Sequence, residues 1–479
     1  MKHSDLLWRL GAAILSGTLT VLATSLDPYW WAAWLAPIPL LMAAFQSSYG
    51  ETWLWVAIAT LIGLTGRVGY DAMFLGPAGE AVLAFLSVAS VGIIVTLTRA
   101  MVRRRNYLLA VFFYPAAVAG LGTIVAAVSP SGTAGSLAYS QMNFLPAIQI
   151  ASLAGIAGIV FTFSLFSALA AIAWHCRAER PRPWVVYCVP SLVIIAVLGY
   201  GLARLAQGQD AKTFPIGLAV SDGASPASHA AVDPSDRSWT QYAAVIPGLA
   251  KGGAKIMVWP EKIAPLDPPG VERVRKLLGD AARESGVYLL AGVTVIGADH
   301  LENRAWLFGR SGELIADYAK QHLVPGFEAR FQPGDEDVVR QIDGTRFGIA
   351  ICKDMDFARL GRAYSRLGIE AMLVPAYDFY SDAWSHASMA VLRGVEGGFS
   401  VVRSARHGLL AVSDRYGRIL AQKASTDANV VSIEISAPLG PGEATLYSRF
   451  GYWFGWLCVA FAALAALSLA IKRPGDDQT

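Results

Sequence analysis

Hydrophobic and polar positions follow two different patterns along this chain. Up to about residue 206, and again near the C-terminus, apolar residues continue for about twenty positions at a time. A helix needs roughly 20 apolar residues to cross about 30 Å of hydrocarbon. We therefore predict eight spans in a multi-pass α-helical membrane domain. They cover about 6–26, 29–46, 53–74, 80–98, 107–128, 147–174, 184–206 and 451–471.

The second pattern fills the region between about residues 212 and 440. Short apolar or β-branched runs predict strands, and amphipathic stretches between them predict helices. Alternation of this kind is typical of an α/β domain whose main sheets are covered by helices. The predicted strands are 214–220, 255–259, 287–293, 305–308, 347–351, 371–375, 400–404, 409–413 and 430–433, and the predicted helices are 237–250, 271–285, 357–367 and 382–397.

These patterns divide the chain into three parts. We expect a membrane domain at 1–210, a catalytic-type α/β domain at 211–440, and a last span with a short tail at 441–479. Composition agrees with this division. Hydrophobic residues make up 54% of the chain, which is more than a soluble protein can bury, and charged residues make up only 16%. A net charge of +3 is too small to indicate nucleic-acid binding.

Basic residues in the short loops predict the orientation in the membrane. Loops rich in Lys and Arg stay in the cytoplasm. With eight spans, the basic clusters all fall on one side, which places both termini in the cytoplasm and the 211–440 domain outside it. The clusters are Lys2 and Arg9; Arg99, Arg103, Arg104 and Arg105; Arg177, Arg180 and Arg182; and Lys472 and Arg473.

One cysteine stands apart from the other three. Cys176, Cys188 and Cys458 lie in or beside apolar spans, whereas Cys352 belongs to the α/β domain. In the stretch FGIAICKDMDF, Cys352 lies at the end of a predicted strand and just before a predicted helix. Backbone N–H groups at such a position favour a thiolate. An inert buried cysteine is the alternative. No Cys or His spacing indicates a metal site.

Two other strand ends carry groups that suit a thiol nucleophile. Glu261 follows Pro260 in MVWPEK, and Lys320 and His322 lie in DYAKQHLVPGFE. None of these residues indicates catalysis by itself. A glutamate or lysine after a strand is usually solvated, and a histidine among apolar residues is usually packed. Together with the thiol they supply a proton acceptor and a cation, which is a usable set for covalent catalysis.

The order of these motifs resembles the Glu-Lys-Cys triad of the nitrilase superfamily. With the flanking spans, the chain resembles the apolipoprotein N-acyltransferase family over nearly its whole length. The motifs that carry the resemblance are LAYSQ at 137–141, WPE at 259–261, KQHLVPGFE at 320–328, ICKD at 351–354, RGVEGGFSVVRSARHG at 393–408 and TLYSRFG at 445–451.

The resemblance implies an αββα sandwich and a role for each matching residue. Glu261 would be the general base, Lys320 the lysine that stabilises the oxyanion, and Cys352 the acyl-accepting nucleophile. Glu328 would position the lysine. The family's substrates are a membrane phospholipid as acyl donor and the α-amine of a lipid-modified lipoprotein N-terminus as acceptor, with no cofactor, in the bacterial inner membrane.

The chain departs from the family beside the cysteine. Lys353 and Asp354 stand where many members have a Tyr-Glu pair, and PAYDFYSDAW at 375–384 replaces a usual loop. Asp354 keeps an acidic side chain, and Asp378 or Asp382 is expected to keep part of the loop's role. We predict that the Lys353 ammonium lowers the pKa of the neighbouring thiol. The identity of the acyl acceptor depends on these positions.

Further residues have two interpretations each. Phe327, Trp384 and His386 are predicted to contact substrate. The first two, with Phe331, Phe379 and Tyr380, belong to loops that either dip into the membrane interface or pack in a core. Arg67 and Asp71 either pair structurally or line a lipid path.

Two alternatives to an N-acyltransferase stay open from the sequence. The first is a membrane-tethered amidase or other C–N hydrolase that uses the same triad, with water in place of the amine. The second is a non-catalytic membrane protein that keeps the fold as a binding module.

Overall fold

The computed structural model describes residues 3–179, 184–207, 212–223 and 236–470. The chain forms two compact units. One comprises the residues up to Ser129, Gly135–Leu205 and the residues from Tyr452 onward, and the other comprises Pro130–Ala134 and Ala206–Gly451. Five of the basic residues used to predict orientation lie outside the described residues: Lys2, Arg180, Arg182, Lys472 and Arg473.

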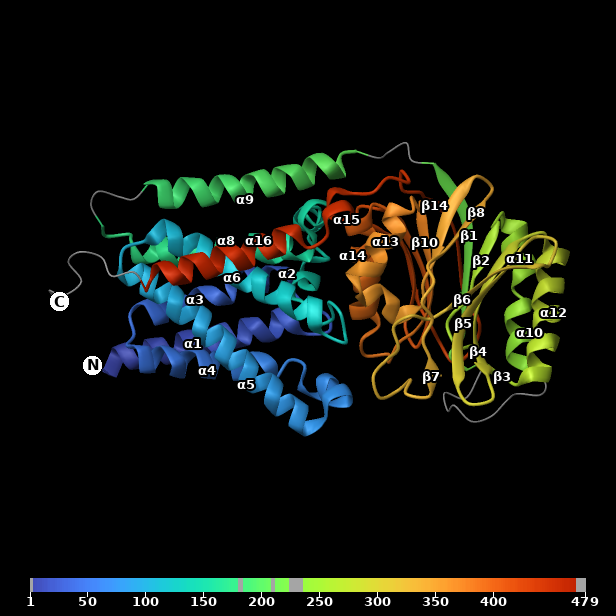
Figure 1. Cartoon of the computed structure of the whole chain (residues 1–479), viewed down its shortest axis with the longest axis horizontal. Helices are drawn as coiled ribbons and strands as arrows, with labels where there is room; N and C mark the ends of the chain where they lie inside the picture. Colours follow the sequence, from blue (N-terminus) through green and yellow to red (C-terminus); the bar gives the residue numbers. More distant parts are fainter. Residues whose placement is uncertain (1–2, 180–183, 208–211, 224–235, 471–479) are drawn as a thin grey trace. The chain divides into compact units, whose positions relative to one another are not determined.

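The first unit is built of apolar helices (Figure 1). Within the described residues, all eight predicted runs are largely helical. Among the same residues, five helices are long and apolar enough to cross a membrane: α1 (His3–Thr24), α5 (Val68–Arg103), α6 (Tyr107–Val128), α8 (Ala151–His175) and α9 (Trp184–Leu205). The shorter apolar helices are α2 (Trp30–Leu35) with α3 (Pro37–Phe45), α4 (Tyr49–Leu64) and α16 (Trp453–Ser468). The short α7 (Leu145–Ile148) precedes α8.

The predicted boundaries of the third and fourth spans are wrong. Helix α4 ends at Leu64, and the helix that follows it begins at Val68 and contains a break at Gly76, whose φ is 63°. Pro77 follows the break and has no N–H to continue the helix. Arg67 and Asp71 therefore lie at the start of α5, where their side chains pair at 3.3 Å, as the pairing interpretation predicts.

The fourth span is also longer than predicted, which changes the position of Arg99. Because α5 continues to Arg103, Arg99 is buried inside the helical unit and does not lie in a loop. Its Nε atom donates to the carbonyl oxygen of Ser47 over 2.9 Å. This arginine satisfies backbone groups at the end of α3, so it does not contribute to a loop cluster.

The described part of the second unit contains two sheets (Figure 1). The first has eight strands, with β14-β1-β2-β4-β5-β6 in order, β3 beside β4 and β7 beside β5, and the second has six, in the order β13-β12-β11-β10-β9-β8. The strands of the first sheet are β1 (Thr213–Val220), β2 (Ile256–Val258), β3 (Pro265–Leu266), β4 (Tyr288–Ile296), β5 (Leu301–Phe308), β6 (Leu314–Ala319), β7 (Phe331–Gln332) and β14 (Val431–Pro438). Those of the second are β8 (Val338–Ile342), β9 (Thr345–Ile349), β10 (Ala371–Tyr377), β11 (Ser400–Arg406), β12 (Leu409–Ser413) and β13 (Ile419–Ala424).

Helices cover the outer face of each sheet. Helices α10 (Arg237–Ala243), α11 (Ile246–Gly252) and α12 (Pro268–Ser285) lie against the first sheet, and α13 (Ala358–Arg366) and α14 (Ala383–Gly397) against the second (Figure 1). The short α15 (Leu446–Phe450) follows β14. The inner faces share one apolar core, in which the rings of Phe214 and Phe347 lie 5.0 Å apart. The predicted αββα sandwich is confirmed.

The strand directions bring several strand ends to one place. Strand β2 runs parallel to β1 and β4, and β10 runs parallel to β9 and β11. Strands β4, β5 and β6 are successively antiparallel, so β6 has the direction of β4 again. The residues that follow β2, β6, β9 and β10 therefore leave their sheets at carboxyl ends, where open α/β sheets place their ligands.

Candidate active site

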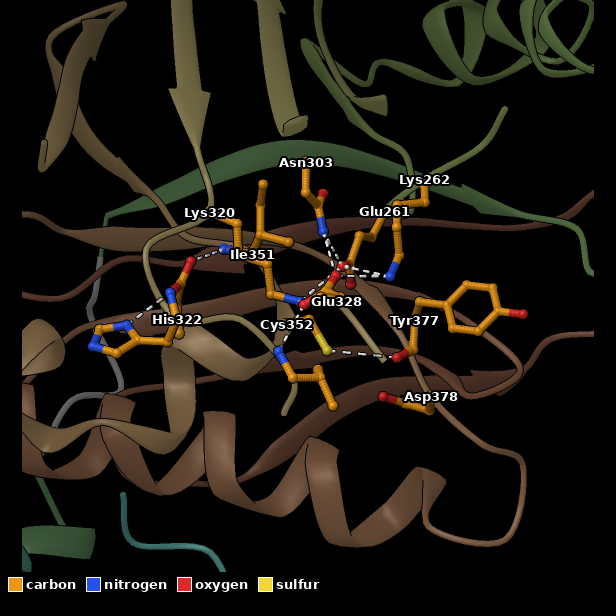
Figure 2. Close-up of polar contacts among 12 residues, drawn as sticks. Glu261, Lys262, Asn303, Lys320, His322, Glu328, Ile351, Cys352, Tyr377 and Asp378 are labelled. Carbon is orange, nitrogen blue, oxygen red and sulfur yellow. Dashed lines mark hydrogen bonds and ion pairs between the residues drawn. The ribbon is translucent and has the colours of Figure 1, made fainter. Parts of the chain in front are cut away.

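Glu261 lies fully buried just beyond the end of β2. Its backbone N–H donates to the carbonyl oxygen of Ala376 over 3.3 Å, which links the two sheets at this point. Its Oε1 atom accepts from Nδ2 of Asn303 over 2.6 Å and from Nζ of Lys320 over 3.0 Å (Figure 2). The other oxygen, Oε2, is buried and has no hydrogen-bond partner among the described residues. One carboxylate oxygen is therefore held by two donors, and the other has no donor among the described residues.

Lys320 follows β6 and lies between two carboxylates. Its Nζ atom is 3.0 Å from Oε1 of Glu261 and 2.9 Å from Oε2 of Glu328. Burial opposes the charged form of the lysine, but the two carboxylates outweigh it and hold the pKa of Lys320 well above its usual value. The side chain is therefore a buried, permanently charged ammonium.

Glu328 anchors the lysine from the loop after β6. Its Oε2 atom also accepts from the backbone N–H of Val324 over 2.8 Å, and Oε1 accepts from Asn303 over 3.0 Å and from Lys262 over 2.8 Å. Burial alone would raise the pKa of Glu328, but the ammonium groups of Lys320 and Lys262 lower it below the usual range. Glu328 is therefore ionised.

Cys352 lies at the turn after β9, as the first residue of a short 3₁₀ helix, Cys352–Asp356. Its φ of 45° is in the left-handed region, which costs a residue with a side chain about 1–3 kcal/mol and is common at active sites. The thiol donates to the carbonyl oxygen of Tyr377 over 3.5 Å. Burial and the charge of Glu261 raise the pKa of Cys352, and Lys320 offsets this only in part. At rest the group is a neutral thiol.

The expectation that Lys353 lowers the pKa of the thiol is wrong. The ammonium of Lys353 lies 3.5 Å from Oδ2 of Asp356 and 5.8 Å from the centre of the Phe357 ring. Its charge is balanced there, and the pKa of Cys352 is raised because burial dominates. The helix that follows the cysteine is also only a short 3₁₀ turn, which has a weaker dipole than a long α-helix.

Asp354 joins the cysteine turn to the lysine loop. Its Oδ2 atom accepts from the Tyr318 hydroxyl over 2.7 Å and from the backbone N–H of Ile351 over 3.0 Å. Oδ1 accepts from the backbone N–H groups of Gln321 and His322 over 3.2 and 2.8 Å. The carboxylate is buried and fully used, so it fixes the loop that carries Lys320 against the turn that carries Cys352.

His322 is a packed histidine, in agreement with the structural interpretation of its sequence. Its Nδ1 atom lies 3.0 Å from Oδ1 of Asp354, and its ring stacks on Phe357 with centres 3.7 Å apart. Figure 2 shows the ring directed away from the thiol.

Asp378 and Asp382, in the segment that departs from the family, each pair with a basic side chain from outside that segment. Oδ2 of Asp378 accepts from Nη1 of Arg403 over 2.9 Å, and Nε2 of His386 lies 2.9 Å from Oδ2 of Asp382. Burial raises the pKa of Asp378 although Arg403 opposes it. Burial would lower the pKa of His386, but Asp382 and Asp378 together raise it. The structure thus places His386, a predicted substrate contact, in an ion pair.

The five aromatic residues predicted for interface loops have different environments. Phe327 is 41% exposed and packs against Phe379 with ring centres 5.3 Å apart, and Tyr380 is 54% exposed. Trp384 is half-buried at the start of α14. Phe331 is buried, as the core-packing interpretation predicts. Exposed aromatic surface beside the site therefore comes mainly from Phe327 and Tyr380.

Sequence reasoning missed the roles of three residues. Asn303 on β5 donates to both glutamates, and Lys262 donates to Glu328. The carbonyl oxygen of Tyr377 accepts a hydrogen bond from the thiol of Cys352. The only signal was position, because Lys262 directly follows WPE and Asn303 precedes a predicted strand. Neither position reveals where the side chain points.

The fold and the arrangement of these side chains indicate a membrane protein with a domain of the carbon-nitrogen hydrolase class. The family model described as carbon-nitrogen hydrolase matches residues 231–439, and the model for the apolipoprotein N-acyltransferase N-terminal domain matches residues 16–169. The chain belongs to the apolipoprotein N-acyltransferase family. It is therefore an acyltransferase and a bacterial membrane protein.

Similar known proteins include apolipoprotein N-acyltransferases and an amidase. The apolipoprotein N-acyltransferase of Geobacter metallireducens is 29% identical over 376 residues, which are 71% of this chain and 70% of that protein. Apolipoprotein N-acyltransferase 1 of Treponema denticola is 24% identical over 416 residues, 71% of this chain and 73% of that protein. An omega-amidase from Homo sapiens is 32% identical over 156 residues, 28% of this chain and 56% of that protein.

Among solved structures, an amidase from Nesterenkonia sp. is similar to this chain. The match has 21% sequence identity and a TM-score of 0.42, and it covers 48% of this chain and 92% of that one.

Proposed function

We propose that this enzyme moves a fatty acyl chain from a membrane phospholipid, through a thioester on Cys352, to the α-amine of a lipid-modified lipoprotein N-terminus. The observation that carries the proposal is the pairing of a neutral thiol with Glu261, whose Oε2 atom is buried and has no partner among the described residues, and with the fixed ammonium of Lys320. Family membership supports the choice of donor and acceptor.

In the first half-reaction, the thiol must lose its proton while it attacks, because its raised pKa leaves little thiolate beforehand. Oε2 of Glu261 takes the proton, and the sulfur forms a bond to the ester carbonyl carbon. The ammonium of Lys320 and the backbone N–H of Lys353 stabilise the oxyanion, at about 2.7–4 kcal/mol per donor. The C–O bond then breaks, Glu261 returns the proton to the leaving alkoxide, and lysophospholipid departs.

In the second half-reaction, the acceptor amine attacks the thioester carbonyl. Glu261 takes a proton from the amine nitrogen, the C–S bond breaks, and the proton returns to the sulfur. The same oxyanion donors serve both halves. Glu328 and Asp354 take no proton in this scheme, because both carboxylates are already occupied by donors from Lys320 and from the lysine loop.

The proposal includes a location for the α/β domain, which we place at 211–440 and outside the cytoplasm. The basic residues Arg103, Arg104 and Arg105 at the end of α5 support this orientation. A cysteine introduced at the exposed position Lys276 of α12 should react with a membrane-impermeant maleimide on intact cells. Labelling that requires cell lysis would contradict the orientation.

A second candidate is an amidase or other C–N hydrolase. The similarity of 28% of this chain to an omega-amidase favours it. In that reaction, water would take the place of the amine in the second half-reaction. The triad alone does not distinguish the two activities, because both pass through an acyl group on the cysteine.

A partition assay tests the proposal. Purified protein is incubated with a phospholipid that carries a labelled acyl chain, with or without a diacylated lipopeptide. The proposal predicts label on Cys352 that moves to the lipopeptide. Label that appears only as free fatty acid would favour the hydrolase, and no label on the wild type would indicate a non-catalytic module. Cys352→Ala is the control without a nucleophile.

A further inference from the structure

Lys262 brings a second cation into the site. The side chain is 20% exposed, and its Nζ atom lies 2.8 Å from Oε1 of Glu328 and 3.6 Å from Oε1 of Glu261. Figure 2 shows it on the side of the glutamates opposite the Lys320 loop. Lys320 contacts the same two carboxylates, so the four side chains form a closed ring in which acidic and basic groups alternate.

The ring is electrically balanced. Two carboxylates and two ammonium groups sum to zero, whereas Glu261, Glu328 and Lys320 without Lys262 would carry one net negative charge in a buried site. Such a charge would oppose both thiolate formation and the tetrahedral oxyanion at the neighbouring thiol. The second lysine removes that obstacle.

The backbone is shaped to bring this lysine into place. Lys262 has a φ of 51°, in the left-handed region, and is among seven non-glycine residues with positive φ in the described part of the chain. Cys352 is another. Arg406 donates to the carbonyl oxygen of Lys262 over 3.0 Å and holds this conformation. Strained residues of this kind persist where the surroundings fix them, and they cluster at active sites.

Lys262 also contacts the residue that holds the thiol. Its ammonium lies 5.5 Å from the centre of the Tyr377 ring, and the carbonyl oxygen of Tyr377 accepts from the thiol of Cys352. The ammonium is 5.6 Å from the ring centre of Phe331 on another side. The lysine is thus braced by two aromatic rings while it contacts both glutamates.

We propose that Lys262 is a positioning residue of the active site, which balances Glu261 and Glu328 so that Lys320 stays directed at the thiol during thioester formation. The inference rests on the proposed function for the identity of the reaction. It does not depend on which molecule supplies the acyl group.

The pH profile should reveal this role. Glu328 is faced by Lys320 from the end of β6, Lys262 from the end of β2, Asn303 from β5 and the Val324 N–H from its own loop, with Glu261 across the ring. Both lysines lower the pKa of Glu328. Cys352 itself is faced by the charges of Glu261, Lys320, Asp378 and Arg403. Without Lys262 the ring would carry one net negative charge, which opposes ionisation of the thiol. The acidic limb of the alkylation profile, which thiol ionisation sets, should therefore move to higher pH.

The test uses the full-length protein in detergent with Lys262→Met, Lys262→Gln and Lys262→Arg. The matched control is Lys423→Met, on an exposed position of β13. Iodoacetamide alkylation of the Cys352 peptide is followed by mass spectrometry between pH 4 and 9, and a melting curve accompanies each variant. We expect the midpoint of the acidic limb to move up by about one pH unit or more in both neutral variants. Reactivity below the limb then falls about tenfold per unit. Arg at 262 and the control should keep the wild-type limb.

The outcomes separate positioning from packing. A neutral variant that folds and keeps the wild-type limb would overturn the proposal, and so would failure of both neutral variants to fold while Lys262→Arg folds. Alkylation requires no acyl substrate. A wild type that shows the limb but accepts no acyl group would therefore count against the proposed function alone.

Discussion

The Nζ atom of Lys320 donates to Oε1 of Glu261, while Oε2 of the same carboxylate is buried without a partner among the described residues. The two oxygens of this carboxylate can therefore have different roles. In the proposed mechanism, the held oxygen fixes the side chain and the other oxygen receives the proton of Cys352.

The asymmetry predicts the effect of Glu261→Gln. The amide oxygen can still accept from Lys320 and Asn303, but the amide nitrogen cannot take a proton, so acylation of Cys352 should fall by about 10²–10⁴-fold. The measurement is single-turnover acylation by a labelled phospholipid. The melting temperature serves as the control for folding, and a folded variant that retains more than a tenth of the wild-type rate would contradict the role of Glu261.

Glu328 should contribute stability that depends on pH. Its pKa is lowered in the folded protein, so its contribution is present above the unfolded value of about 4.3 and is lost as pH falls through the folded value. The difference in melting temperature between wild type and Glu328→Gln should therefore be widest near pH 7 and should narrow below about pH 4. A difference that stays constant from pH 7 to pH 3 would show that ionisation of Glu328 is not involved.

Asp354→Asn should weaken both the fold and the site. The amide has one acceptor where the carboxylate has two, so the donors at one oxygen, such as Tyr318 and Ile351, lose their partner. We expect a loss of about 3 kcal/mol in the free energy of unfolding, with reduced Cys352 acylation because the two loops separate. Chemical denaturation measures the first effect. Asp335→Asn, at an exposed position, is the matched control and should change neither quantity.

Lys353→Met should leave the reactivity of Cys352 nearly unchanged. The Lys353 ammonium is balanced by Asp356 and does not control the pKa of the thiol. Rates of iodoacetamide alkylation at pH 7 to 9 provide the comparison. If alkylation slows tenfold in Lys353→Met while the melting curve stays as in the wild type, the Lys353 ammonium does lower the pKa of the thiol, as the sequence suggested.

Much of the fold follows from sequence patterns, and the misses have local causes. Strands β3, β6, β7, β8 and β13 were missed. Strands β3 and β7 have only two residues each, and β6, β8 and β13 contain partly or fully exposed side chains, so no apolar run marks them. The predicted helix at 237–250 is two helices, since Pro247 lies in the first turn of α11 and has no N–H to continue α10.

The candidate site could be predicted only in part. Apolar runs show that Glu261 and Cys352 follow strands, and the strand directions bring those ends together. The contact of Lys262 with the two glutamates could not be predicted, because it depends on the left-handed backbone conformation of this residue. The raised pKa of Cys352 depends on burial between two sheets, which no local pattern encodes.

The proposed mechanism requires Cys352 to carry the acyl group during transfer. The most direct measurement is the mass of the Cys352 peptide after the enzyme has been incubated with a phospholipid of known acyl chains and no acceptor. We predict an added acyl mass on this cysteine that hydroxylamine removes and that is absent in Lys320→Met. An unmodified Cys352 peptide from a preparation that still transfers label to lipopeptide would contradict it.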